Sequence, residues 1–316
     1  MKLQQAGKKE SHWGVSAGVL LLALYLTTCQ ARAPKQTDEA AQRKVADKAD
    51  SSPKVREQKM QELIESILKK DPAAVLLARK YGLSASAEVI KLTKHDDVKV
   101  RRIALNCLDE IGGAEAVMAM AEALSDDDPQ VRAAGLRGLQ HHPEPAVYRN
   151  LLNAYDEVFD AYTRQQLALL IGKMGTVVKI NDLQLRCTKE QAREAQEGCN
   201  VALAHLGDQP AQAEFIKHLQ ETHGADRARY LEYASYLHAP WLLRPLLPIL
   251  NDKSPMIRVG VDARPDLIDS LRACDLAVIL IAGIAQPKFS FMVNRMTNYN
   301  DDQLAEVRRF VLMQPN

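Results

Sequence analysis

The chain has 316 residues, of which 47% are hydrophobic and 26% charged, as in ordinary folded proteins. Aromatic residues make up only 5% while Ala and Leu are plentiful, which favours helix over strand. The 41 basic and 40 acidic residues leave a net charge of +1, so no long-range field would gather a polyanion and a nucleic-acid partner is not expected.

The N-terminal segment has the layout of an export signal. Lys2, Lys8 and Lys9 precede a strongly apolar stretch over residues 15–26. These 12 residues are too few for a bilayer core, which needs roughly 20. A basic region followed by a short apolar stretch is typical of a signal peptide, here predicted over residues 1–28.

The end of this stretch, Leu26-Thr27-Thr28-Cys29, resembles the lipobox of bacterial lipoproteins, although Thr28 stands where Ala or Gly is usual. The resemblance implies that Cys29 is lipidated and becomes the first mature residue. Gln30 follows, and by resemblance to lipoprotein sorting this implies an outer-membrane protein that faces the periplasm. The alternatives are an inner-membrane anchor formed by an uncleaved N-terminal helix, or plain secretion.

Residues 29–53 form a polar segment with almost no large apolar side chains. Such a segment buries too little surface to offset its conformational entropy, so we expect a flexible tether. The folded body is predicted over residues 54–316.

Internal repetition is the strongest pattern in this body. Residues 100–108 align with residues 131–139 at an offset of 31, and each copy follows an acidic turn. A third copy of the turn lies at residues 250–258. Asp128 is predicted to cap a helix and Pro129 to open it, because Asp accepts free N–H groups and Pro has none to lose. Repeats of this length with one helical hairpin each predict an all-α solenoid.

The run Asp128-Pro129-Gln130-Val131-Arg132 and the Ala/Leu-rich helix after it resemble the HEAT family, in particular the HEAT-like repeats of phycobilisome lyases. The resemblance covers about residues 73–285 and implies an α-solenoid of HEAT-like helical hairpins. It says little about function.

Two regions interrupt the rhythm. Residues 176–186 are predicted to be extended, and residues 260–265 widen one repeat. Insertions of this kind map to loops on one face of a solenoid, where they are either neutral or carry binding specificity. Residues 301–312 are predicted to form a helix that caps the C-terminal end of the stack.

The remaining cysteines do not predict a chemical site. If residues 187–199 were one helix, the backbones of Cys187 and Cys199 would lie about 18 Å apart, so a disulfide would need a break at Gly198. Cys107 and Cys274 are expected to be small buried side chains.

We found no residues that predict catalysis. The eight histidines are scattered, no pair of Cys or His has metal-ligand spacing, and neither a nucleophile elbow nor a phosphate-binding loop occurs. We therefore expect no catalytic residues, no metal, no cofactor and no enzymatic activity.

Arg101, Arg132 and Arg258 occupy equivalent positions in three repeats. In similar proteins this arginine pairs with an acidic residue of the adjacent turn and ties repeats together; the alternative is a cationic stripe that grips an acidic peptide. Tyrosine and tryptophan are common in interface hot spots, so we expect exposed contact residues for a partner among them; the alternative is that they fill gaps between repeats, as such side chains equally often do in a solenoid. The four candidates are Tyr230, Tyr233, Tyr236 and Trp241.

Together these features predict a non-catalytic scaffold or adaptor at the bacterial cell envelope that binds a protein partner through the solenoid surface. An immunity-type lipoprotein that neutralises a toxin would be a special case. The rival hypothesis is an enzyme of the HEAT-like lyase class, which an export signal argues against.

Overall fold

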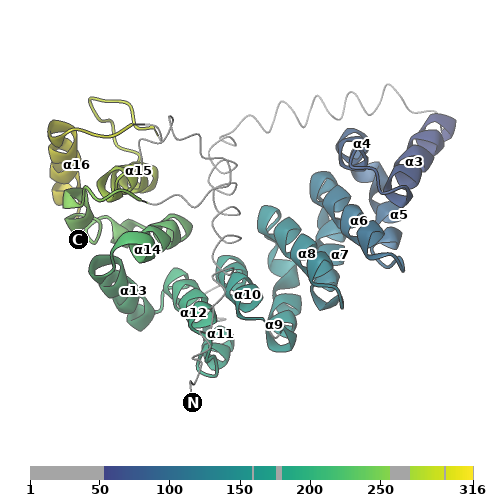
Figure 1. Ribbon diagram of the computed structural model, residues 1–316, viewed down its shortest axis with the longest axis horizontal. Helices are drawn as coiled ribbons and strands as arrows, with labels where there is room; N and C mark the ends of the chain where they lie inside the picture. The colour runs from purple at the N-terminus through teal and green to yellow at the C-terminus, as the bar shows by residue number, and fades with distance from the viewer. Residues whose placement is uncertain (1–52, 159, 176–179, 257–270, 295–296, 316) are drawn as a thin grey trace, which may run out of the picture. The chain divides into compact units, whose positions relative to one another are not determined.

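The computed structural model describes residues 53–158, 160–175, 180–256, 271–294 and 297–315 (Figure 1). Within these ranges every regular element is a helix, and the one extended pairing is an isolated antiparallel bridge between Pro255 and Arg272. The prediction of an all-α fold is confirmed for the described residues. The chain divides into two compact units, with the boundary at residue 216.

The first unit is a stack of helical hairpins. Its α-helices are α3 (Pro53–Leu68), α4 (Ala74–Tyr81), α5 (Ser86–Leu92), α6 (Val98–Ile111), α7 (Ala114–Glu122), α8 (Pro129–His141), α9 (Tyr148–Glu157), α10 (Ala161–Met174), α11 (Ile180–Cys187) and α12 (Arg193–His205). Short 3-10 helices η1 (Gly82–Ala85), η2 (Ala123–Ser125) and η3 (Pro145–Val147) lie between them. Helix α13 (Gln209–Glu221) spans the boundary between the units.

The helices of this unit form two rows. Helices α4, α6, α8, α10 and α12 pack on one another in succession, and α5, α7, α9 and α11 each pack against the first-row helix that follows (Figure 1). The facing sides carry the apolar residues, such as Leu105, Leu139 and Leu167, whose side chains are fully buried. The core therefore runs along the stack, between the rows.

Three first-row helices, α6, α8 and α10, begin with an Asp cap of the kind that the sequence shows. Asp97 accepts from the amides of Lys99 and Val100, and Asp128 from those of Gln130 and Val131. Pro129 stands at the first helical position of α8. Asp160 caps α10 in the same way. The predicted capping is thus confirmed, and each cap fixes where the preceding turn ends.

Glycines permit the closest contacts between helices. A Cβ on Gly135 of α8 would lie 2.6 Å from the carbonyl oxygen of Met120. A Cβ on Gly198 of α12 would lie 2.7 Å from Gln165 Cγ and 2.9 Å from the Gln165 carbonyl oxygen of α10. Gly198 is therefore a packing residue inside a continuous helix, and the chain does not break there.

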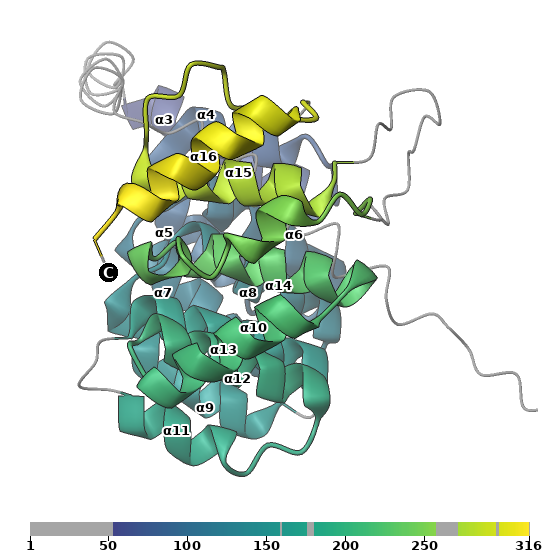
Figure 2. The ribbon, with the colours of Figure 1, turned by 90° about the vertical axis from the view of Figure 1, so that its left-hand side faces the viewer.

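The second unit continues with helical elements. They are α14 (Gly224–Leu237), η5 (Pro240–Leu242), η6 (Pro248–Asn251), α15 (Ala273–Ala285) and α16 (Asp301–Met313). Figure 2 shows α14, α15 and α16 following one another in layers. Helix α16 is the predicted C-terminal helix and buries Leu304, Val307 and Val311.

One predicted element differs from the structure. Residues 180–187 are helix α11, so the expectation of an extended stretch over 176–186 is wrong for its described part. Residues 176–179 and 260–265, the signal peptide and the tether lie outside the described residues. No described helix is both long and apolar enough to span a bilayer.

Candidate functional site

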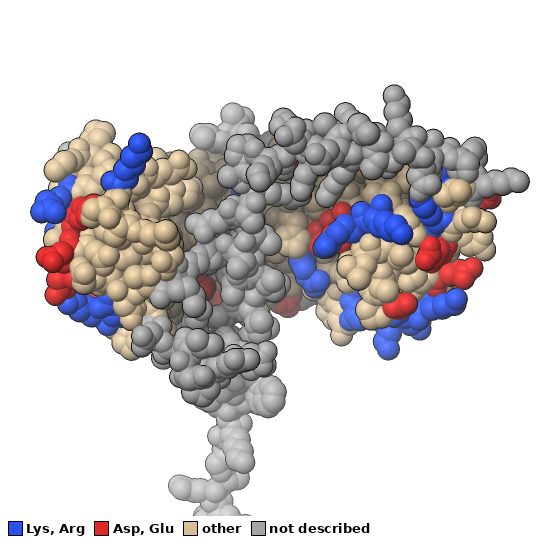
Figure 3. Space-filling model, turned by 90° about the horizontal axis from the view of Figure 1, so that it is seen from above, with Lys and Arg blue, Asp and Glu red and all other residues tan. Residues whose placement is uncertain are grey.

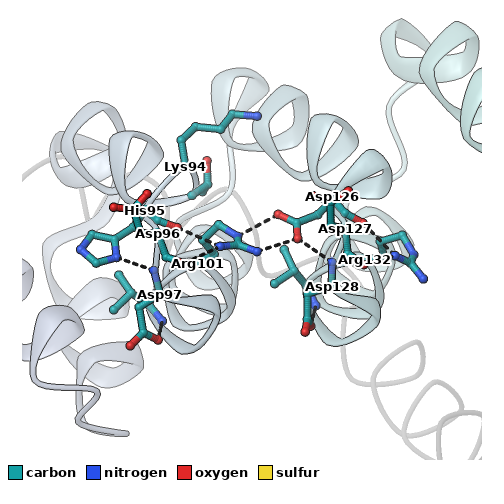
Figure 4. A network of polar contacts seen from close by, with 12 residues as sticks. Lys94, His95, Asp96, Asp97, Arg101, Asp126, Asp127, Asp128 and Arg132 are labelled. Carbon is teal, nitrogen blue, oxygen red and sulfur yellow. Dashed lines mark hydrogen bonds and ion pairs between the residues drawn. The ribbon is translucent and has the colours of Figure 1, made fainter.

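The predicted arginine ladder is built at the N-termini of the first-row helices. Arg101 extends from α6 to the next turn, where its Nε and Nη2 donate to Asp126 Oδ2 and Oδ1, each at 2.8 Å (Figure 4). Its Nη1 donates to the carbonyls of His95 and Asp96, in its own turn, at 2.9 and 3.0 Å. One guanidinium thus binds the backbone of its own turn and a carboxylate of the next repeat.

Arg164 repeats this geometry two repeats further on. Its Nε and Nη2 donate to Glu190 Oε2 and Oε1 at 2.7 and 3.0 Å, and its Nη1 donates to the Val158 carbonyl at 3.0 Å. In the second unit, Arg227 forms an ion pair with Asp252 and donates to the Gln220 carbonyl at 3.0 Å. Each pair of an arginine and a carboxylate is called a rung of the ladder. The rungs are largely shielded from water; the Glu190 side chain, for example, is only 5% exposed.

The acidic member of each rung has a fixed place in its turn. Asp126 and Glu190 each stand two residues before the N-cap residue of the next helix, and each accepts the amide of that N-cap residue, from Asp128 at 2.9 Å and Ala192 at 3.0 Å. Asp252 accepts the Ser254 amide at 2.9 Å in the same manner. The carboxylate therefore shapes the turn and binds the arginine at once.

Arg132 keeps only half of this arrangement. Its Nη1 donates to the carbonyls of Asp126 and Asp127 at 2.8 and 2.9 Å (Figure 4). Its Nε and Nη2 reach no acceptor among the described residues, because Val158 stands where the next turn would supply the carboxylate. The predicted ladder is confirmed for Arg101 and wrong for Arg132, while Arg258 lies outside the described residues.

The sequence carries a signal for the rung at Arg164. Asp160 and Arg164 have the same four-residue spacing as Asp128 and Arg132. Arg227 gave no such signal, since His223, and not a capping residue of the usual type, precedes its helix. Gln196 stands at the equivalent place in α12, where its Nε2 donates to the Glu190 carbonyl at 2.8 Å.

Ion pairing in the ladder lowers the pKa of its carboxylates. The hydrogen bond from Arg164 is the main cause that lowers the pKa of Glu190 to about 2. Burial acts against ionisation of Asp126, but hydrogen bonds from Arg101 and the Asp128 amide outweigh it, so its pKa is also lowered. Both carboxylates are therefore charged at neutral pH, as the rungs require.

Cys187 and Cys199 form a disulfide with a Cα–Cα distance of 5.7 Å, so the expectation that they are too far apart is wrong. The turn at residues 188–192 separates α11 from α12 and folds one cysteine back onto the other. The buried Tyr155 hydroxyl donates to Glu190 Oε2 at 3.1 Å and lies 3.3 Å from Cys199 Sγ. The disulfide therefore holds the turn that supplies the Glu190 rung.

Cys107 and Cys274 are buried free thiols, as expected. Burial raises the pKa of Cys107 to about 12, so the thiol is protonated and unreactive. Among the residues that the structure describes, no group of three or more His, Cys, Asp or Glu side chains is placed to hold a metal ion.

The aromatic candidates are divided by burial. Tyr230 and Tyr233 are 6% and 4% exposed, so the expectation that they are exposed is wrong. Tyr230 stacks on His218 with ring centroids 5.3 Å apart and meets Tyr233 edge-on at 5.8 Å. These two side chains fill space between helices. Tyr236 and Trp241 are half-buried, and their contact with a partner stays a prediction.

Comparison with known proteins supports the repeat assignment. The family model of HEAT repeats matches residues 86–172, from α5 into α10. No curated protein sequence matches the chain. A similar solved structure is the complex of CpcE and CpcF of phycocyanin lyase from Nostoc sp. PCC7120, with 14% identity, a TM-score of 0.47, and coverage of 80% of this chain and 93% of that chain. A likeness this distant says nothing of activity. Residues 86–172 are thus similar to HEAT repeats.

Proposed function

We propose that the chain is a non-catalytic protein-binding scaffold anchored at the bacterial cell envelope. The observation that carries this proposal is the use of the shielded charged groups: Arg101, Arg164 and Arg227 each form an ion pair that joins successive turns. These groups stabilise the stack. Function then depends on the surface that the stack presents to another molecule.

The distribution of charge supports a protein partner. Basic and acidic side chains are interspersed on the face seen in Figure 3. A mixed surface suits an interface with matched polar contacts, whereas binding to nucleic acid requires a basic stripe. Tyr236 and Trp241 are the aromatic contacts that we propose for this partner.

The disulfide supports the proposed location. Disulfides persist in oxidising compartments such as the periplasm and are rare in the bacterial cytosol. Cys187–Cys199 is therefore consistent with export. Together with the lipobox-like Leu26–Cys29 segment, it supports an outer-membrane lipoprotein that faces the periplasm. Inner-membrane anchoring by an N-terminal helix is the alternative.

The test is an affinity capture from native membranes with the full-length protein, beside a Cys29→Ala variant, with intact-mass analysis of both. We expect one stoichiometric envelope protein to be captured, and we expect the mass of the lipid to be absent from the variant. An unprocessed cytoplasmic chain without a lipid would contradict the anchoring. A chain that captures no protein in either form would contradict the scaffold.

A further inference from the structure

Arg132 has the same pair of donors, Nε and Nη2, as Arg101 and Arg164, but no carboxylate of the described residues accepts from them. In Arg101 and Arg164, Nε and Nη2 together bind one carboxylate in a bidentate geometry, while Nη1 is held by carbonyls of the arginine's own turn. The Nη1 of Arg132 is held by two such carbonyls, so this guanidinium is already oriented. Its side chain is half-buried.

Among the described residues, the adjacent turn supplies no carboxylate to Nε and Nη2 of Arg132. Val158 occupies the turn position of Asp126 and Glu190 and has no carboxylate. The nearby acidic residues have other roles: Glu157 accepts from the Ser125 hydroxyl at 3.1 Å, and Asp160 accepts from the Thr163 amide at 3.1 Å. The rung between α8 and α10 is therefore open on its acidic side.

We propose that Arg132 binds a carboxylate that the partner protein supplies, from an Asp or Glu side chain in an acidic segment. The partner's carboxylate takes the place that Asp126 and Glu190 take in the other rungs and completes the ladder from outside. This inference rests on the proposed scaffold function and names the chemistry of its partner.

The acidic surroundings of Arg132 do not prevent this binding. Asp127, Asp128 and Asp160 lie in the adjoining turns and oppose a further negative charge. However, the rung at Arg101 lies among Asp96, Asp97, Asp127 and Asp128, and Asp126 still binds there at 2.8 Å (Figure 4). A bidentate, pre-oriented guanidinium outweighs such neighbours in this same fold.

The chain itself suggests the variants. Arg132→Gln removes the bidentate edge but keeps a donor for the turn carbonyls, as Gln196 does in α12. Val158→Asp fills the rung from within and should block an outside carboxylate. Val158→Leu is the matched control, because it changes the side chain without adding an acceptor.

The probe is a synthetic peptide with the sequence of residues 124–130, which carries the carboxylate that Arg101 binds. Its C-terminus is amidated, so that only side-chain carboxylates can bind, and a control peptide has Asn at all three Asp positions. Binding is followed at millimolar peptide through the arginine Nε–Hε signals of the ¹⁵N-labelled full-length protein. The signal that Arg132→Gln removes is that of Arg132.

We expect the Asp peptide to shift the Arg132 signal saturably in the wild type and in Val158→Leu. The Asn peptide should leave it in place, and Val158→Asp should weaken peptide binding by about tenfold or more. Equal binding to Arg132→Gln, equal binding to Val158→Asp, or an unshifted Arg132 signal would each overturn the proposal.

Affinity capture separates this inference from the scaffold function. Capture of the same envelope protein by the wild type and by Arg132→Gln, in equal amounts, would leave the scaffold function standing and overturn the open rung. Loss of that protein from Arg132→Gln and from Val158→Asp, but not from Val158→Leu, would support the open rung.

Discussion

The contacts on the two sides of α10 are built differently. Towards α12, three features meet: the bidentate Arg164–Glu190 pair, the close approach at Gly198, and the disulfide that ties α11 to α12. Towards α8, the described residues offer no ionic rung, and Gln140 donates to Gln166 Oε1 at 3.1 Å. Helix α10 also packs more extensively on α12 than on α8.

This difference teaches that one turn residue decides whether an ion pair connects two successive repeats. Glu190 and Val158 stand at equivalent positions, two residues before the N-cap residue of the next helix. The first connects two repeats through a carboxylate. The second leaves the arginine of the preceding repeat available to another molecule, while both turns keep the fold of the stack.

The largest expected effect is on the side of α12. Replacement of both Cys187 and Cys199 by Ala should lower the free energy of unfolding by about 3 kcal/mol, because the cross-link restricts the unfolded chain. Guanidinium denaturation of the two proteins would measure it. A reductant should destabilise the wild type and leave the double variant unchanged. A wild type whose stability is insensitive to reductant would contradict a stabilising role of this disulfide.

The close approach of α12 to α10 is tested by Gly198→Ala. The new Cβ would lie 2.9 Å from the Gln165 carbonyl oxygen, so the helices must separate, at a cost of about 2 kcal/mol. Gly283→Ala in α15 is the control: its Cβ comes no closer than 3.4 Å, to the His238 ring, so this variant should be neutral or more stable. Equal thermal midpoints for the two variants would refute the packing argument.

The ionic rung is tested by Glu190→Gln, which should cost about 1–2 kcal/mol. Because the pKa of Glu190 is lowered from 4.5 to about 2, its ionised form stabilises the native state above pH 4.5. This contribution is lost as the pH falls towards 2. The variant should therefore show a smaller loss of stability in this acidic range, whereas the exposed Glu194→Gln should behave as the wild type.

The smallest expected effect is on the contact between α10 and α8. Val158→Asp should gain about 1 kcal/mol from pairing with Arg132, and this gain offsets the apolar burial lost at Val158, which is only 9% exposed. In a double-mutant cycle with Arg132→Gln this gain should vanish. If the gain persisted in the Arg132→Gln background, position 158 would not be the place of the carboxylate that Arg132 lacks.

The candidate site was only partly predictable from the sequence. The pairing of Arg101 followed from the repeat, because Asp126 lies in a turn whose motif was visible. The disulfide did not follow, because it depends on the turn at residues 188–192. That turn is stabilised by Glu190, which accepts the Gln191 and Ala192 amides and is itself held by Arg164 from the preceding repeat.

The burial of Tyr230 and Tyr233 could not be predicted for a similar reason. Helical spacing places tyrosines on a face, but only packing shows what covers that face. Here Tyr230 lies against His218 of α13 and against Tyr233. The same residues would have been exposed contact candidates on a helix at the edge of a stack.

The sequence by itself determined the helical repeats and where the capped helices α6 and α8 begin. A cap such as Asp128 acts on amides within three residues, and an apolar stripe repeats within a helix, so neighbouring residues suffice. Only the tertiary structure decided which arginines are paired, which cysteines are bonded and which tyrosines are covered. Arg101 and Asp126 are 25 residues apart, and such partners meet only when the packing of whole repeats sets their register.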